Sequence, residues 1–199
     1  PICINVREVN MIRFMFKKML QTMKSRYDYD VQYQQDILTN DLSAFLKFMG
    51  FQTMASHSSG LPVAPLFAAR IRAIIWDDCG PCTQLVVKMA LEAKMDAQLI
   101  HQIIERDVDN LPADIGLVVQ FVDLVLAHHP GADDLRDKIL EQWGEKGLIA
   151  ISFAISSYRV YPALKYALGY GKSCSKVQVN DQAVIPSRLV SDSMGAGHG

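Results

Sequence analysis

Long apolar runs and an export signal are both lacking in this 199-residue sequence. No apolar stretch reaches the roughly 18 to 20 residues that a membrane-spanning helix needs, and the most apolar segment, residues 147–157, is shorter. Near the N-terminus, basic residues such as Arg7, Arg13 and Lys17 interrupt the apolar positions, which is not the pattern of a signal peptide. We therefore expect no membrane span and a cytoplasmic location.

A strong charge of either sign is also lacking. The 20 Lys and Arg residues nearly balance the 21 Asp and Glu residues, and the formal net charge is −1. So small a net charge gives little overall attraction to nucleic acid or to an anionic membrane, and we expect no nucleic-acid partner. Hydrophobic residues make up 50% of the chain, which is enough for one buried core at this length.

Cysteine is scarce. The four cysteines form one close pair, Cys79 and Cys82, and two distant single residues, Cys3 and Cys174. This is not the framework of a small secreted protein held together by disulfides. A structural zinc site needs four ligands, and neither the other cysteines nor the five histidines supply a second pair at ligand spacing. We expect no metal and no cofactor.

Convincing two-residue alternation and internal repeats are absent, so the sequence predicts an all-α fold rather than a sheet. Apolar residues recur at helical spacing from Leu66 to Leu168. We expect Pro162 to kink the last helix without ending it, because the apolar pattern continues beyond it. The predicted helices of this part cover residues 64–77, 80–94, 96–106, 112–129, 132–143 and 146–168.

Composition divides the chain into three parts. The loop-like residues 55–62 separate an N-terminal helical arm (1–60) from the main helical domain (61–170), and residues 171–199 are predicted to form an irregular C-terminal tail. In the arm, residues 4–25 predict an amphipathic helix, and a second helix is expected to begin after Asn40 or Asp41. The segment between them, residues 27–35, is polar.

A stripe of methionines widens the apolar face of the first predicted helix. Met11, Met15, Met19 and Met23 follow each other at four-residue spacing. Such a face is typical of core or subunit packing. A helix that lies on a membrane surface remains an alternative, because lysines are nearby. We expect a homo-oligomer.

The motif that carries chemistry is Cys79-Gly80-Pro81-Cys82, at the predicted start of a helix. Two thiols at this spacing can close a disulfide within one turn, and the helix dipole favours their thiolate forms. Thioredoxins share this tetrapeptide, but residues 83–168 predict successive helices where that fold needs strands. Two buried cysteines with a purely structural role remain an alternative.

Residues 61–170 carry an ordered set of motifs: the apolar helix Leu66–Ile75, the dithiol opening the next helix, and Met89-Ala90-Leu91-Glu92-Ala93. A short helix from Asp96, a proline-started helix from Leu111 and a long apolar helix complete the set. This order resembles the carboxymuconolactone decarboxylase-like superfamily, and within it the alkylhydroperoxidase D type. It implies an all-helical homo-oligomer that reduces hydroperoxides with its dithiol and is re-reduced by a partner protein.

The resemblance also implies roles for the two cysteines. Cys82 would attack the hydroperoxide, and Cys79 would resolve the sulfenic acid into a disulfide. Two positions depart from the family, since Val86 stands where the relay histidine is expected and Phe67 where the relay glutamate is expected. Among the polar residues offered instead, Asp78 is a candidate acceptor of the thiol proton, although acids beside a helix start are also common for structural reasons.

Other candidates are less specific. Arg70 and Arg72 either face solvent or bind an anionic group, and the tyrosines of the last helix either pack in the core or serve the site. A non-catalytic oligomer of the same fold, and a lactone-decarboxylating lyase, remain alternative functions. The further candidate site residues are His57, Asp77, Thr83, Gln84, His101, Tyr158, Tyr161 and Tyr166.

Overall fold

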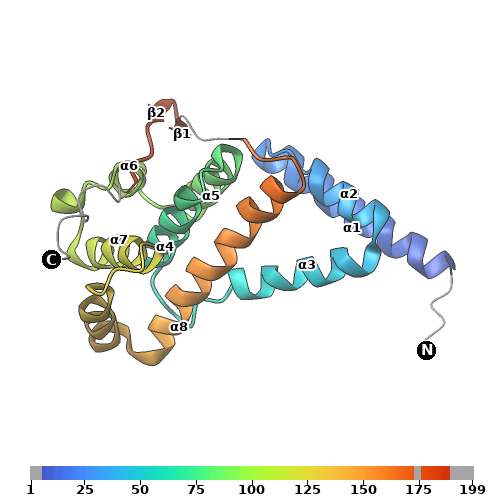
Figure 1. The fold of residues 1–199 in the computed structure, drawn as a ribbon. Coiled ribbons are helices and arrows are strands. Elements are labelled where there is room, and N and C mark those ends of the chain that lie inside the picture. The colour runs from blue at the N-terminus through green and yellow to red at the C-terminus, as the bar shows by residue number, and fades with distance from the viewer. Residues whose placement is uncertain (1–5, 173–175, 189–199) are drawn as a thin grey trace, which may run out of the picture.

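The computed structural model describes residues 6–172 and 176–188. Cys3 and Cys174, and the end of the predicted tail, lie outside these ranges. The described chain forms eight α-helices, one short 3₁₀ turn and a two-stranded sheet, so the predicted all-α class is confirmed (Figure 1).

Helix α4 (Val63–Trp76) is the centre of the main domain. Its residues 65–75 are all buried, because the helix is apolar on nearly every side and its neighbours cover it all round. It packs against α5 (Gly80–Glu92), α6 (Ala97–Glu105), α7 (Ala113–Leu126) and α8 (Ala132–Ala167), and the 3₁₀ turn η1 (Val108–Asn110) packs against α6 and α7. The predicted helices of this domain are therefore present, with ends shifted by a few residues.

Helix α8 consists of two helical stretches joined at Gly144. This residue has φ 65° and ψ −173°, a backbone conformation that is essentially restricted to glycine, and it lies where the sequence predicts a break. The second stretch continues through Pro162, so the prediction that this residue does not end the helix is confirmed; the break in α8 is at Gly144. By length and composition α8 is the one described helix that could cross a membrane, although core helices pass the same test, and its apolar window is 44% buried.

The N-terminal arm folds as three helices around a second core. Helices α1 (Val6–Tyr27), α2 (Gln32–Asn40) and α3 (Leu42–Ala55) enclose Leu20, Tyr33, Leu38 and Phe45. Asp41 caps α3 by accepting a hydrogen bond from the backbone of Ala44 at 2.9 Å, as one of the two predicted caps. Helix α2 is not predicted by the sequence, because its Gln-rich segment shows little apolar periodicity.

The arm packs on the main domain. Helix α3 runs along α8, while α1 and α2 reach the far end of α8 (Figure 1). At the end of α1, Arg26 and Tyr27 contact Glu92 of α5, and Lys88 donates a hydrogen bond to the backbone of Tyr27. The two cores therefore meet along α5 and α8.

Part of the predicted irregular tail is a hairpin. Strands β1 (Val177–Val179) and β2 (Gln182–Val184) pair antiparallel, with Val177 opposite Val184. The valines point into the main core, and the strands pack against α5 and α6. Asn180 adopts a positive φ of 53° in the tight turn between the strands.

Candidate functional site

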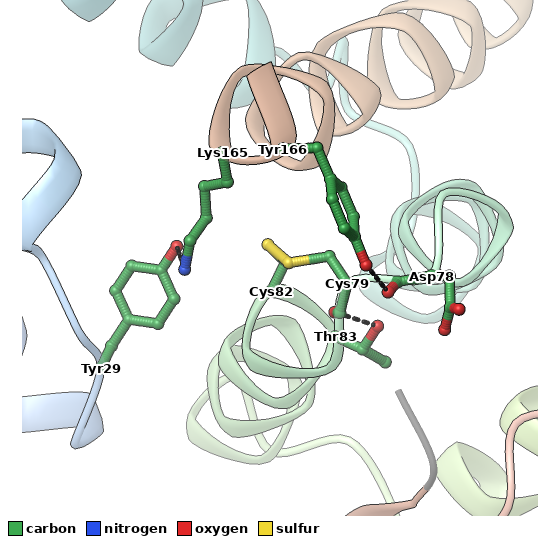
Figure 2. The surroundings of a disulfide bond; sticks show 7 residues. All are labelled: Tyr29, Asp78, Cys79, Cys82, Thr83, Lys165 and Tyr166. Carbon is green, nitrogen blue, oxygen red and sulfur yellow. Dashed lines mark hydrogen bonds between the residues drawn. A yellow bond between two sulfur atoms is a disulfide. The ribbon is translucent and has the colours of Figure 1, made fainter. Parts of the chain in front are cut away.

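A disulfide joins Cys79 and Cys82 at the start of α5. Cys79 is the N-cap residue, Gly80 and Pro81 form the first turn, and the Cα atoms of the two cysteines are 5.2 Å apart. Thr83 steadies this turn, because its hydroxyl donates to the Cys79 carbonyl at 3.0 Å. The expected placement of the pair in the first turn of a helix, within disulfide range, is confirmed (Figure 2).

The residues just before the dithiol are held by α8 and by the chain that follows it, residues 168–172 and 176–188, here called the C-terminal segment. Arg159 forms two hydrogen bonds of 3.0 Å with the Asp77 carboxylate, and the Tyr166 hydroxyl donates to the Asp78 carbonyl at 2.7 Å. Arg188 pairs with the Asp78 carboxylate and donates to the carbonyl of Ile75. The backbone at the disulfide is thus fixed from two sides.

Asp78 does not present its carboxylate to the sulfurs. Figure 2 shows the carboxylate directed away from the disulfide, and Arg188 forms an ion pair with it. The Asp78 backbone has a φ of 53°, and its carbonyl accepts the Tyr166 bond. This geometry favours a part in fixing the turn and gives no support to the expected role as acceptor of the thiol proton.

The C-terminal segment completes the N-terminus of α5. The backbone of Gly80 donates to the Lys172 carbonyl at 3.1 Å. The Gln84 side chain makes two hydrogen bonds of 2.8 Å with the backbone of Gln178 in β1, one as donor and one as acceptor. Thr83 and Gln84, which sequence reasoning offered as polar neighbours of the thiols, are therefore structural contacts of this turn.

One face of the disulfide borders a cavity of about 380 Å³ between the arm and the main domain. Cys82 is in its wall and Cys79 is not. All three helices of the arm contribute to the wall together with α4, α5 and α8, and much of its lining is aromatic. The tyrosines of the wall are Tyr27, Tyr29, Tyr33, Tyr158 and Tyr161.

The positions where the resemblance predicts relay residues are occupied by buried apolar side chains. Val86 lies in the cavity wall, one helical turn after Cys82, and is buried. Phe67 is buried in α4, and the Arg70 guanidinium lies over its ring, 4.9 Å from the centroid. Neither position supplies a proton-carrying group near the disulfide.

Two residues that sequence reasoning missed supply polar groups close to the disulfide. Lys165, only 2% exposed, extends from α8, and its Nζ lies 3.4 Å from the hydroxyl of Tyr29 (Figure 2). The ammonium also lies over the rings of Tyr29 and Tyr33. The available signal was the position of Lys165 on the same helix face as the buried residues Tyr158 and Pro162.

Burial shifts the pKa values of Lys165 and Tyr29 in opposite directions. It lowers the pKa of Lys165 below its ordinary value, because the ammonium loses solvation; the negative charge of Asp30 acts in the opposite direction. Burial raises the pKa of Tyr29 to about 12, so the phenol keeps its proton at neutral pH. The pair therefore places an amine and a phenol hydroxyl in contact with each other near the disulfide, with Tyr29 in the cavity wall.

The remaining sequence candidates separate into two groups. Arg70, Tyr158 and Tyr161 lie in the cavity wall. His57 and His101 do not, since His57 bonds the Ser59 hydroxyl at 2.7 Å and packs on Phe153, and His101 lies on α6. Arg72 is committed to a buried ion pair with Asp123.

Within the described ranges, no three His, Cys, Asp or Glu side chains are grouped closely enough to hold a metal ion. No protein-family model, curated protein or solved structure matches this chain closely enough to assign it a family.

Proposed function

We propose that this protein is a thiol-dependent oxidoreductase that reduces hydroperoxides with Cys79 and Cys82. The observation that carries the proposal is the asymmetry of the pair. Both sulfurs are at the N-terminus of one helix, but only Cys82 lies in the wall of a cavity large enough for an organic molecule. An attacking thiol needs access to substrate, whereas a resolving thiol needs access only to its partner.

The proposed reaction starts from the reduced dithiol. The Cys82 thiolate attacks one peroxide oxygen, the O–O bond breaks, and the leaving alkoxide takes a proton to become an alcohol. The Cys79 thiol then attacks the Cys82 sulfenic acid, which forms the S–S bond and releases water. A dithiol of a partner protein reduces the disulfide and is itself oxidised.

Three features support thiolate chemistry at Cys82 without a histidine relay. The dipole of α5 favours a negative charge in its first turn. Lys165, which lies near the disulfide and donates to Tyr29, is a source of positive charge there, and the Tyr29 hydroxyl is a proton donor in the same wall as Cys82. With Val86 and Phe67 at the relay positions, we expect slow turnover.

The test is intact-mass analysis of the reduced protein before and after addition of cumene hydroperoxide. We expect wild type to lose two hydrogens and Cys82→Ser to stop consuming peroxide. Cys79→Ser should instead gain oxygen on Cys82. Cys3→Ser is the matched control and should behave as wild type. If Cys82→Ser consumes peroxide as fast as wild type, the redox proposal fails and a non-catalytic role replaces it.

A further inference from the structure

Arg70 is a buried cation to which no described carboxylate is paired. Its side chain lies in the cavity wall and is 8% exposed, yet the guanidinium has only one hydrogen bond, from Nη2 to the Ala55 carbonyl at 2.8 Å. Its Nε is buried without any partner. Two residues along the same helix, Arg72 is fully bonded to Asp123 and to three backbone carbonyls.

The surroundings of Arg70 do not neutralise it. The described wall of the cavity contains no acidic side chain, and Arg70 is held from two sides by the rings of Phe67 and Tyr158, at 4.9 and 5.3 Å. Burial raises the pKa of Tyr158, so its phenol stays neutral and is no counter-ion. A buried charge in an apolar cavity is unfavourable until an opposite charge joins it.

A second polar atom in the same wall is also unsatisfied. The Gln34 side chain, 2% exposed, has a buried Oε1 that accepts no hydrogen bond. Two unpartnered polar groups in one aromatic cavity are the pattern of a preformed ligand site, in which the ligand supplies the missing partners.

We infer that the cavity binds a carboxylate-bearing organic molecule, with its anionic group on Arg70 and its apolar body against the tyrosines. This rests on the proposed function for the identity of the substrate, which becomes an organic hydroperoxide that carries a carboxylate. Hydrogen peroxide would leave most of the roughly 380 Å³ cavity unfilled and would not neutralise Arg70. Position 67, where the resemblance predicts glutamate, is phenylalanine, so an internal acid does not compete for Arg70.

The binding test uses two matched probes that cannot react with thiols, 4-isopropylbenzoate and its neutral analogue 4-isopropylbenzyl alcohol. Calorimetry on the disulfide form should show tighter binding of the acid. Arg70→Gln should weaken the acid roughly ten- to hundredfold, the range for a charged hydrogen bond, and leave the alcohol nearly unchanged. Arg70→Lys should retain part of the preference, and Arg136→Gln, an exposed arginine on α8, should retain all of it.

The activity test compares cumene hydroperoxide with its 4-carboxylate derivative. Wild type should oxidise faster with the carboxylated peroxide, and Arg70→Gln should lose that preference. If 4-isopropylbenzoate binds but neither peroxide oxidises the thiols, the redox proposal fails and the proposed anion site is still supported. Equal binding of acid and alcohol by wild type, or equal acid binding by wild type and a folded Arg70→Gln, would overturn the inference.

Discussion

Arg72 shows how a buried arginine is stabilised in this fold. Its guanidinium bonds both carboxylate oxygens of Asp123, at 3.0 and 3.1 Å, and its Nη1 donates to the carbonyls of Ile103, Ile104 and Ser187. Burial lowers its pKa, and Asp123 opposes that effect. One side chain on the central helix therefore connects α7, the end of α6 and the C-terminal segment.

Removing Arg72 is predicted to destabilise the protein. Arg72→Met should lower the free energy of unfolding by about 1–3 kcal/mol, because Asp123 keeps only Arg106 as a charged partner and several buried carbonyls lose their donor. The double variant Arg72→Met/Asp123→Leu should recover part of this loss, since no buried acid remains. Urea unfolding measures both, and equal stabilities of wild type and Arg72→Met would contradict the prediction.

Lys165 is predicted to make stability depend on pH. Because burial lowers its pKa below 10.5, the unfolded chain binds more protons than the folded one between the two values. The free energy of unfolding therefore rises with pH through that window. Relative to Lys165→Met, wild type should gain stability as the pH approaches 10.5 from below, where Tyr29 still keeps its proton.

Urea unfolding of both proteins across this range measures the difference, and Lys146→Met, on the exposed face of α8, is the control. A constant difference between wild type and Lys165→Met at every pH would show that Lys165 has an ordinary pKa in the folded protein.

At the scale of elements, the hydrogen bonds between Gln84 and β1 are predicted to hold the hairpin on α5. Gln84→Ala removes both, which should cost about 1–2 kcal/mol and increase amide hydrogen exchange in residues 177–184. Gln120→Ala is the control, because its side chain bonds only within its own helix. Unchanged exchange in the hairpin would show that the buried valines suffice to hold it.

The predicted elements succeeded where local pattern and burial agree. The helices from residue 63 onward follow apolar periodicity. The break at Gly144 and the cap at Asp41 each depend on one residue type, a glycine that can adopt a positive φ and an aspartate that can accept a backbone hydrogen bond. Helix α2 and the hairpin were missed for the opposite reason. Their burial depends on surfaces supplied by distant parts of the chain, so a short local segment carries little sign of it.

The site divides in the same way. The Cys79–Cys82 motif is local, so the sequence predicts its position in the first turn and its disulfide spacing. The cavity wall is not local. Tyr29 and Lys165 are far apart in the chain and meet only because the arm packs on the end of α8. The predicted boundary at residues 55–62 suggested an appendage, whereas the arm supplies a large part of the cavity wall.

At the scale of the whole molecule, the outer face of α1 remains uncovered. Met11, Phe14 and Met15 are each more than half exposed, and Met19 is 40% exposed, while the opposite face packs on the arm core through Leu20. An apolar patch of this kind usually marks a contact with another molecule. Met23 packs within the chain, on the arm core, but Met11, Met15 and Met19 of the methionine stripe are not explained by such packing.

We predict that this face joins copies of the chain into a homo-oligomer. Met11→Lys/Met15→Lys should convert the oligomer to monomer in sedimentation velocity at micromolar concentration, with helical content unchanged, because two charges would be buried in the contact. Gln98→Lys, on an exposed position of α6, is the control. A monomeric wild type under these conditions would contradict the prediction.

The C-terminal segment has a consequence for the order in which the protein is made. Lys172, Gln178 and Arg188 complete the surroundings of the dithiol turn, and the ribosome adds them after α4, α5 and α8. Helices that emerge first can pack before these residues exist. A nascent chain that ends at residue 170 should therefore hold its bundle but leave the Cys79–Cys82 turn loosely fixed, so this turn is completed only after the helices have packed.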